Sequence, residues 1–150
     1  MRTLFKGGFI ADGTGAPVYK GDLLVEDGRI VAVGVLGDVA ADEVLDCAGL
    51  VVAPGFIDAH SHNDFFYDRE DAEKFYAPFV RQGITTQVTG NCGFSPFGVE
   101  EDSRFKDKVG GGLFRALKPS SFAEFKQRAK GRLFVNMVPL VGHGTTRISI

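Results

Sequence analysis

The sequence predicts an α/β protein in which a small β segment precedes alternating strands and helices. Residues 1–54 contain short apolar runs separated by turn-forming residues, a pattern typical of small sheets. In residues 55–150, predicted strands alternate with helix-forming segments, which indicates parallel strands joined by crossover helices. We therefore expect two parts that meet near Pro54.

Five apolar runs predict the strands of the first part: Thr3–Ile10, Leu23–Glu26, Arg29–Val33, Val44–Leu45 and Leu50–Val52. Asp27 and Gly28 separate the second run from the third, and this dipeptide supplies the positive φ angles of a tight hairpin turn. A sheet of this size cannot bury a large core alone, so we expect it to need a partner surface.

Three segments are predicted as the strands of the second part: Phe56–His62, Ile84–Thr89 and Leu133–Val141. The first is expected to be largely buried until it turns polar at its end. In parallel α/β folds the functional site lies at the carboxyl ends of the strands. All three histidines of the chain occur at such ends, so we expect the site there.

Two helices are expected between these strands. The first covers Pro78–Gln82, with its proline at the first helical position and Gly83 beyond its end. The second begins at Ser121, which forms a capping box with Glu124, and it stops at Gly131. Its buried face is predicted by three residues at helical spacing: Phe122, Phe125 and Ala129. A surface insertion is expected between the two helices, in two segments: Glu100–Lys108 and Gly110–Gly112.

Composition and charge exclude several classes of protein. The 150 residues are 44% hydrophobic and 24% charged, as in ordinary globular domains. The net charge of −2 gives no reason to expect nucleic acid or a membrane surface as a partner, and no apolar run reaches the length of a spanning helix. Two cysteines are no disulfide framework, so we expect a cytoplasmic protein with reduced thiols and interpret Cys47 as a buried structural thiol.

His60 and His62 are the first candidate metal ligands. Because side chains alternate along a strand, both imidazoles are expected on one face, where they could share a metal. The alternative interpretation is two polar residues at a strand end that bind nothing. Asp58 precedes them on the same face, and it is expected either to orient an imidazole or to bond to the backbone.

Three further candidates follow the next two strands. Cys92 is the third candidate ligand because a thiolate beside two imidazoles suits zinc, and an inert thiol is the alternative. His143, between two glycines, is a candidate to bind substrate, to join the metal shell or to satisfy a loop carbonyl. Arg147 could pair with a substrate carboxylate or form an ordinary salt bridge.

Three motifs resemble a known family. Residues 54–62, Pro-Gly-Phe-Ile-Asp-Ala-His-Ser-His, resemble the first-strand signature of the amidohydrolase superfamily. Two others are similar to motifs of the N-acyl-D-amino-acid deacylases, also called D-aminoacylases: Gly-Ile-Thr-Thr-Gln-Val-Thr-Gly-Asn-Cys-Gly at residues 83–93 and Val-Gly-His-Gly-Thr-Thr-Arg at residues 141–147. The preceding β segment agrees in kind, since such enzymes begin with part of a small β-sandwich.

This resemblance implies a fold and a cofactor. Residues 55–150 would be the first βα units of a (β/α)8 TIM-type barrel, and residues 1–54 the N-terminal portion of a composite β-sandwich domain. The implied cofactor is Zn²⁺, with one ion bound tightly and a second one left open. His60 and His62 would share one metal position, and Cys92 would replace the bridging lysine carboxylate used elsewhere in the superfamily.

The resemblance also implies a reaction, the hydrolysis of the amide bond of an N-acyl-D-amino acid to a carboxylate and a free D-amino acid. The expected partner is therefore this small molecule, with His143 as a substrate-binding residue. The general base, an Asp, and two further metal-binding histidines come from later strands in the family, beyond residue 150. We therefore interpret the chain as an N-terminal portion that is inactive alone.

Two alternatives stay open at this point. One is a ring-opening hydrolase of the dihydropyrimidinase or dihydroorotase type, against which the Asn-Cys-Gly sequence at residues 91–93 argues. The other is a metal-binding module without catalytic activity.

Overall fold

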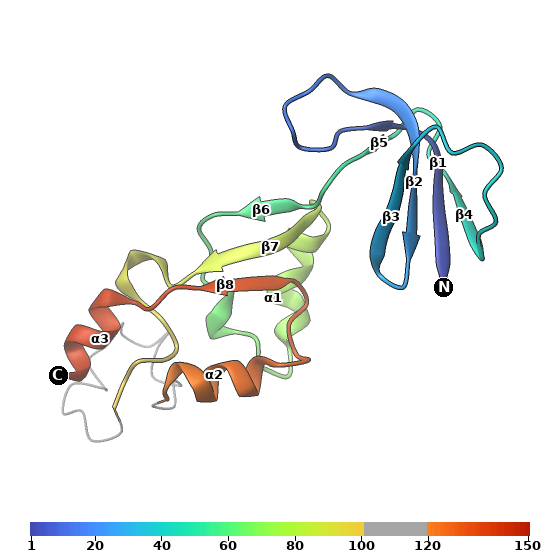
Figure 1. The fold of residues 1–150 in the computed structure, drawn as a ribbon. Coiled ribbons are helices and arrows are strands. Elements are labelled where there is room, and N and C mark those ends of the chain that lie inside the picture. Colours follow the sequence, from blue (N-terminus) through green and yellow to red (C-terminus); the bar gives the residue numbers. More distant parts are fainter. Residues whose placement is uncertain (101–119) are drawn as a thin grey trace. The chain divides into compact units, whose positions relative to one another are not determined.

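A computed structural model describes residues 1–100 and 120–150 of the chain (Figure 1). The expected surface insertion therefore lies, apart from Glu100, outside the described residues. The chain divides after Pro54 into two compact units, Met1–Pro54 and Gly55–Ile150. These ranges coincide with the two parts expected from the sequence, while their assignment to a composite β-sandwich and a barrel stays a prediction.

The first unit is a five-stranded sheet. Its strands are β1 (Arg2–Ile10), β2 (Tyr19–Glu26), β3 (Arg29–Gly34), β4 (Glu43–Asp46) and β5 (Val51–Val52). The order is β3-β2-β1-β4, and β5 also pairs with β1. The first three strands are antiparallel neighbours, whereas β4 and β5 run parallel to β1. All five predicted strands are confirmed, and Asp27 and Gly28 have φ angles of 48° and 77° in the hairpin turn.

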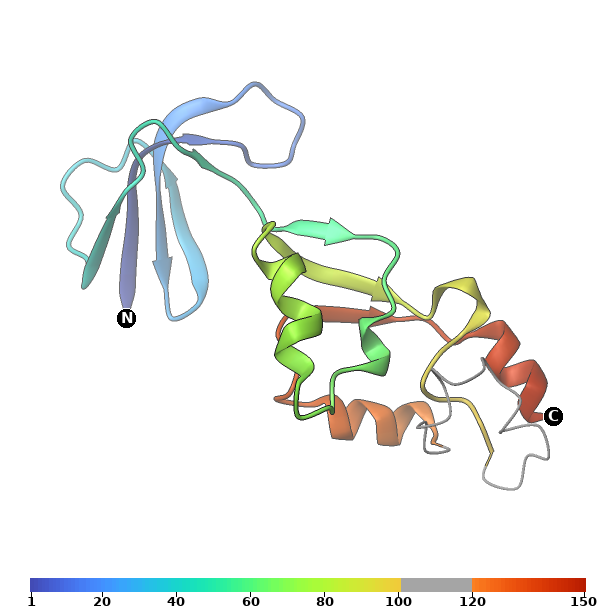
Figure 2. The same cartoon turned by 180° about the vertical axis from the view of Figure 1, so that it is seen from behind.

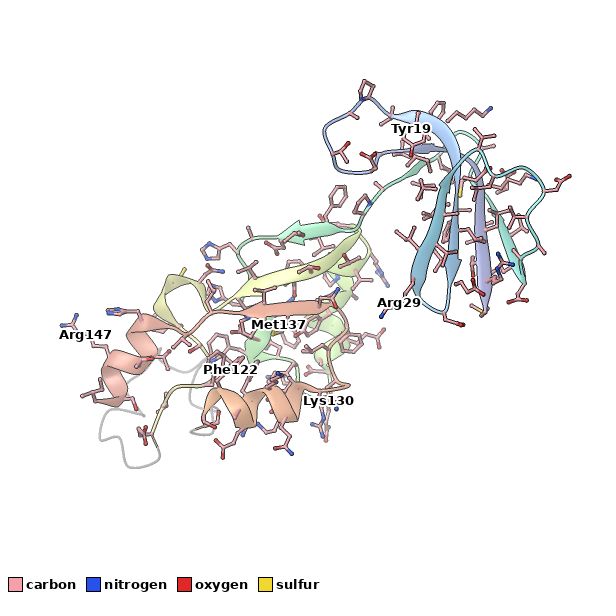
Figure 3. The ribbon with its side chains drawn as sticks, in the orientation of Figure 1. Tyr19, Arg29, Phe122, Lys130, Met137 and Arg147 are labelled. Atoms are coloured by element: carbon pink, nitrogen blue, oxygen red, sulfur yellow. The ribbon has the colours of Figure 1, made fainter. Side chains whose placement is uncertain are left out.

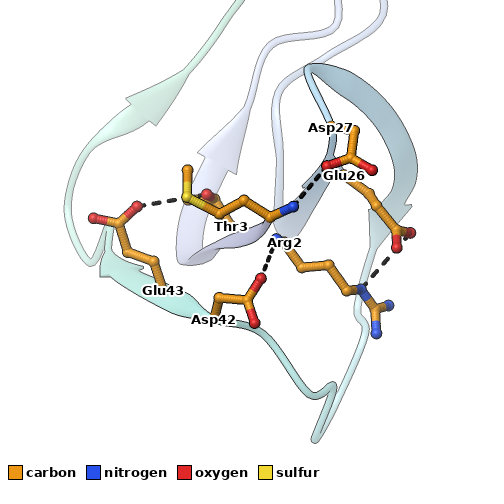
Figure 4. Close-up of polar contacts among 7 residues, drawn as sticks. Arg2, Thr3, Glu26, Asp27, Asp42 and Glu43 are labelled. Carbon is orange, nitrogen blue, oxygen red and sulfur yellow. Dashed lines mark hydrogen bonds and ion pairs between the residues drawn. The ribbon is translucent and has the colours of Figure 1, made fainter.

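Polar contacts at one end of this sheet join its N-terminal residues to the neighbouring strands (Figure 4). The backbone amide of Arg2 donates to Asp42 over 2.6 Å, and the terminal ammonium pairs with Asp27 at 2.6 Å. These groups are exposed, so each contributes little to stability. The sheet buries Leu4, Ile10 and Leu24, and Cys47 is buried beside β1, as expected for a structural thiol.

The second unit is built on three parallel strands, β6 (Phe56–Asp58), β7 (Ile84–Thr89) and β8 (Asn136–Pro139), in the order β6-β7-β8. Its α-helices are α1 (Ala72–Val80), α2 (Phe122–Ala129) and α3 (His143–Ser149). Two short 3-10 helices, η1 (Asn63–Phe65) and η2 (Asn91–Gly93), follow β6 and β7. The prediction of parallel strands with crossover helices is therefore confirmed for the described residues.

The first strand and the first helix of this unit differ from the prediction. β6 ends at Asp58, and Phe56 and Ile57 are 65% and 67% exposed because β6 lies at the edge of the sheet with one neighbouring strand. The predicted burial of this strand is thus wrong for the chain as described. α1 begins at Ala72, so Pro78 lies inside the helix and not at its first position. Proline has no backbone N–H to donate, and its ring is exposed, so this defect lies on the solvent side of the helix.

The core of the second unit lies between the sheet and α1 and α2, which cover the same side of it (Figures 1 and 2). Its buried members are Tyr67, Tyr76, Phe97, Phe125, Ala129 and Val135. The capping box of Ser121 and Glu124 is present at the start of α2, as predicted. Phe122, predicted to be buried, is 45% exposed, since the helix turns it to the rim of this core.

The two phenylalanines of α2 give a matched test of this packing. We expect Phe125→Ala to lower the free energy of unfolding by about 3–5 kcal/mol because the side chain is 2% exposed and its loss leaves a cavity. Phe122→Ala removes the same atoms from a half-exposed position, so its effect should be clearly smaller. Denaturant midpoints of the two variants check this, and equal midpoints would contradict the described core.

None of the described helices is both long enough and apolar enough to cross a membrane.

Candidate metal centre

His60 and His62 lie in the segment that leaves β6. This segment stays attached to the sheet because the amide of Ser61 donates to the carbonyl of Val88 on β7 over 2.9 Å. The amide of His60 donates to Asp58 Oδ1 over 3.1 Å, which tightens the turn after the strand. Of the two expectations for Asp58, the structure shows the bond to the backbone.

Cys92 lies in η2, at the end of β7. Gly90, Cys92 and Gly93 have φ angles of 79°, 57° and 80°, so the loop turns back on itself within four residues. For an L-residue such as Cys92 this left-handed conformation costs about 1–2 kcal/mol, so the surrounding structure must hold it. Asn91 contributes by donating from Nδ2 to the carbonyl of Val88 over 3.1 Å.

The three candidate ligands converge. Potential ligand atoms of His60, His62 and Cys92 all lie within 4.8 Å of one another, and His60 Nε2 is 3.2 Å from Cys92 Sγ. The two imidazole centroids are 5.4 Å apart. With bonds of about 2.0 Å to nitrogen and 2.3 Å to sulfur, a tetrahedral zinc separates such atoms by about 3.5 Å. The His60–Cys92 pair is already close to this separation, and the other pairs, which are at most 4.8 Å apart, would have to close by up to about 1.3 Å around a zinc ion.

The chemistry of the donors narrows the choice of metal. Two imidazoles and one thiol suit zinc, whereas magnesium and calcium prefer oxygen ligands. His60 and Cys92 are exposed and His62 is half-buried, so the cluster opens to one side. His62 Nδ1 is buried and has no hydrogen-bond partner among the described residues. These residues can hold a metal through three ligands and leave further positions open.

The close approach of Gly90 to the next strand fixes the loop of Cys92. A Cβ atom at Gly90 would overlap the carbonyl oxygen of Leu140, just beyond β8. The amide of Leu140 donates to the carbonyl of Thr89 over 2.9 Å, so the ladder between β7 and β8 continues to this point. Glycine is therefore required at position 90 both for its φ angle and for the space.

His143 and Arg147 lie on α3, which follows β8. His143 is the exposed first residue of this helix and is not a member of the ligand cluster. Arg147 is also exposed; its side chain extends outward from α3 (Figure 3), and it forms no ion pair with any residue that the structure describes. A role for either residue in binding substrate stays a prediction.

Comparison with curated proteins finds close sequence relatives. The chain is 40% identical over 154 residues to an N-acyl-D-aspartate deacylase from Alcaligenes xylosoxydans xylosoxydans, and 38% identical over 151 residues to a D-aminoacylase from the same organism. Each alignment covers 98% of this chain, but only 29% and 30% of the two relatives. No protein-family model matches the chain.

Solved structures agree with these relatives. A D-aminoacylase with a binuclear metal centre matches 99% of this chain with a TM-score of 0.78 and 35% identity. The chain is a homologue of the D-aminoacylases. The N-acyl-D-glutamate deacylase of Bordetella bronchiseptica, solved with zinc and a phosphonate mimic of the tetrahedral intermediate, matches 98% of it with a TM-score of 0.73 and 35% identity. The match covers 31% and 30% of the two solved chains.

More distant structures share only the fold. A D-hydantoinase matches 93% of the chain with a TM-score of 0.58 and 24% identity. This likeness concerns the fold alone and agrees with the mixed α/β architecture of the described residues.

A buried carboxyl group close in sequence to the ligand cluster of this D-aminoacylase homologue was not predicted. Asp64, two residues after His62, is 0% exposed, and burial raises the pKa of its carboxyl to about 7. The nearby Thr89 hydroxyl opposes this shift, yet neither oxygen of Asp64 has a hydrogen bond of normal geometry to a described residue. Its burial follows from the turn of η1, for which no sequence pattern gave a signal.

Proposed function

We propose that this chain supplies the first metal ligands of a zinc-dependent hydrolase that cleaves the amide bond of N-acyl-D-amino acids. The observation that carries the proposal is the convergence of His60, His62 and Cys92 at the ends of two adjacent parallel strands. The names of the relatives support the substrate class, and the zinc in the deacylase of Bordetella bronchiseptica supports the metal.

Each residue has a stated part in this proposal. Bound zinc would supply an activated water and would polarise the amide carbonyl. His60 and His62 would hold the ion through their imidazole nitrogens, and Cys92 would hold it as a thiolate that neutralises one of its charges. The exposed side of the cluster admits the substrate, and His143 is the candidate to bind it. The general base, an Asp, is expected outside these 150 residues.

For the architecture we propose the first βα units of a (β/α)8 barrel. The three parallel strands would be part of the barrel wall, and α1 and α2, on one side of them, would be part of its outer layer of helices. The candidate site lies at the carboxyl ends of the strands, where barrel enzymes bind substrate. The sheet of residues 1–54 is then the first portion of the composite β domain. A cytoplasmic location stays a prediction, in keeping with the free thiols of Cys47 and Cys92.

The proposal is tested on the full-length protein that contains this sequence. The protein is stripped of metal by a chelator, reloaded with zinc and assayed with N-acetyl-D- and N-acetyl-L-amino acids. We expect zinc to restore hydrolysis of the D-enantiomers, with magnesium as an ineffective control. Hydrolysis of dihydropyrimidines in place of linear amides would replace the proposal with the ring-opening alternative. Tight zinc binding without any hydrolysis would favour a metal-binding module.

A further inference from the structure

Two small polar residues, which the proposed function does not use, join the candidate ligand loop to the segment of His143. Ser95 follows Cys92 by three residues, and Thr145 follows His143 by two. Each is only 1% exposed, although both have hydroxyl groups that must be satisfied when buried. Their partners show why they are buried.

Each of the two hydroxyls takes part in two hydrogen bonds. The amide of Ser95 donates to Thr145 Oγ1 over 2.9 Å, and this hydroxyl donates in turn to the Ser95 carbonyl over 3.3 Å. Ser95 Oγ accepts from the amide of Gly142 over 3.0 Å and donates to the Phe97 carbonyl over 2.7 Å. Three of these four bonds join residues about 50 positions apart in the sequence.

The backbones of the two segments touch beside these bonds. A Cβ atom at Gly142 would lie 2.6 Å from the Ser95 nitrogen, and one at Gly144 would lie 2.8 Å from the Gly93 carbonyl oxygen. Neither contact leaves space for a side chain. A change in the hydroxyl pair would therefore move the backbone of Gly93, which is adjacent to Cys92.

We propose that Thr145 and Ser95 are positioning residues, whose buried hydroxyls lock the His143 segment onto the Cys92 loop and thereby fix the thiol beside the two imidazoles. This inference rests on the proposed metal site. Cys92 itself has a left-handed φ of 57°, and its Sγ lies 3.2 Å from His60 Nε2. A loop in such a conformation relaxes when its support on the C-terminal side is removed, and the sulfur then leaves the position that zinc requires.

The test measures how well zinc protects Cys92 from alkylation by iodoacetamide in the full-length protein, read on the Cys92 peptide by mass spectrometry. Cys92 is exposed and Cys47 is buried, so the second thiol serves as an internal control. We expect Thr145→Val, which keeps the shape and removes the hydroxyl, to raise the zinc concentration for half-protection about tenfold or more. Thr145→Ser, which restores the hydroxyl, should return it to the wild-type value.

Thr146→Val is the matched control, because Thr146 is the exposed neighbour of Thr145 and should behave as wild type. Wild-type protection by Thr145→Val, or equal weakening by Thr145→Val and Thr145→Ser, would overturn the positioning role and leave the metal site intact. A wild-type protein that zinc does not protect would overturn the proposed site as well. If a thermal melt shows that Thr145→Val is unfolded, Ser95→Ala takes its place. We expect it also to raise the zinc concentration for half-protection of Cys92, and an unchanged value would count against the inference.

Discussion

Replacing Cys92 with alanine is expected to weaken zinc binding more than about a hundredfold. Changes to residues that only support a ligand typically lower metal affinity about 10- to 100-fold, so the loss of a ligand itself should exceed that range. The thiol also contributes the one negative charge of the cluster when zinc is bound. Without it, His60 and His62 remain as a neutral pair whose zinc is less well held.

The measurement is a competition titration of the full-length protein with a chelator of known zinc affinity. Cys47→Ala is the matched control: Cys47 is the other cysteine of the sequence, is buried in the first unit and lies outside the ligand cluster. This variant should bind zinc like the wild type. Equal zinc affinity of the Cys92 and Cys47 variants would remove Cys92 from the site, and two histidines alone would be too few to define it.

Local sequence signals were sufficient for the elements that surround the site. β7 has the predicted bounds, Ile84–Thr89, because a run rich in β-branched residues between two glycines leaves little choice of where the strand begins and ends. The capping box of Ser121 and Glu124 depends on residues three positions apart, so the sequence contains all that it needs. The convergence of His60, His62 and Cys92 was predictable from the rule that parallel strands place their carboxyl ends together.

Features that depend on distant partners were not predictable. The contact of Ser95 with Thr145 joins residues 50 positions apart, and two common polar residues give no local signal of it. The burial of Asp64 depends on the path of η1, and the exposure of Phe56 depends on the position of β6 at the sheet edge. Pro78 was misplaced because the preference of proline for the first helical turn is a tendency, which the packing of Tyr76 overrides.

Substitution of Gly90 by alanine is expected to remove the metal site and to destabilise the second unit by about 2–5 kcal/mol. Two costs add: about 1–2 kcal/mol for an L-residue in the left-handed region, and about 1–3 kcal/mol for overpacking. The overpacking arises because the new Cβ would overlap the carbonyl oxygen of Leu140. Backbone cannot rotate away as a side chain can, so the loop must move, and Cys92 moves with it.

Gly131→Ala separates the two costs. Gly131 has a φ of 75°, close to the 79° of Gly90, but a Cβ atom there meets nothing within 4 Å. This variant should lose only the conformational part, about 1–2 kcal/mol, and should bind zinc normally. Denaturant midpoints and zinc titrations of both variants check the pair. If the Gly90 and Gly131 variants had the same denaturant midpoint and the same zinc affinity, the backbone at Leu140 would be able to move aside at little cost. The position of Cys92 would then not depend on the fit between the ends of β7 and β8.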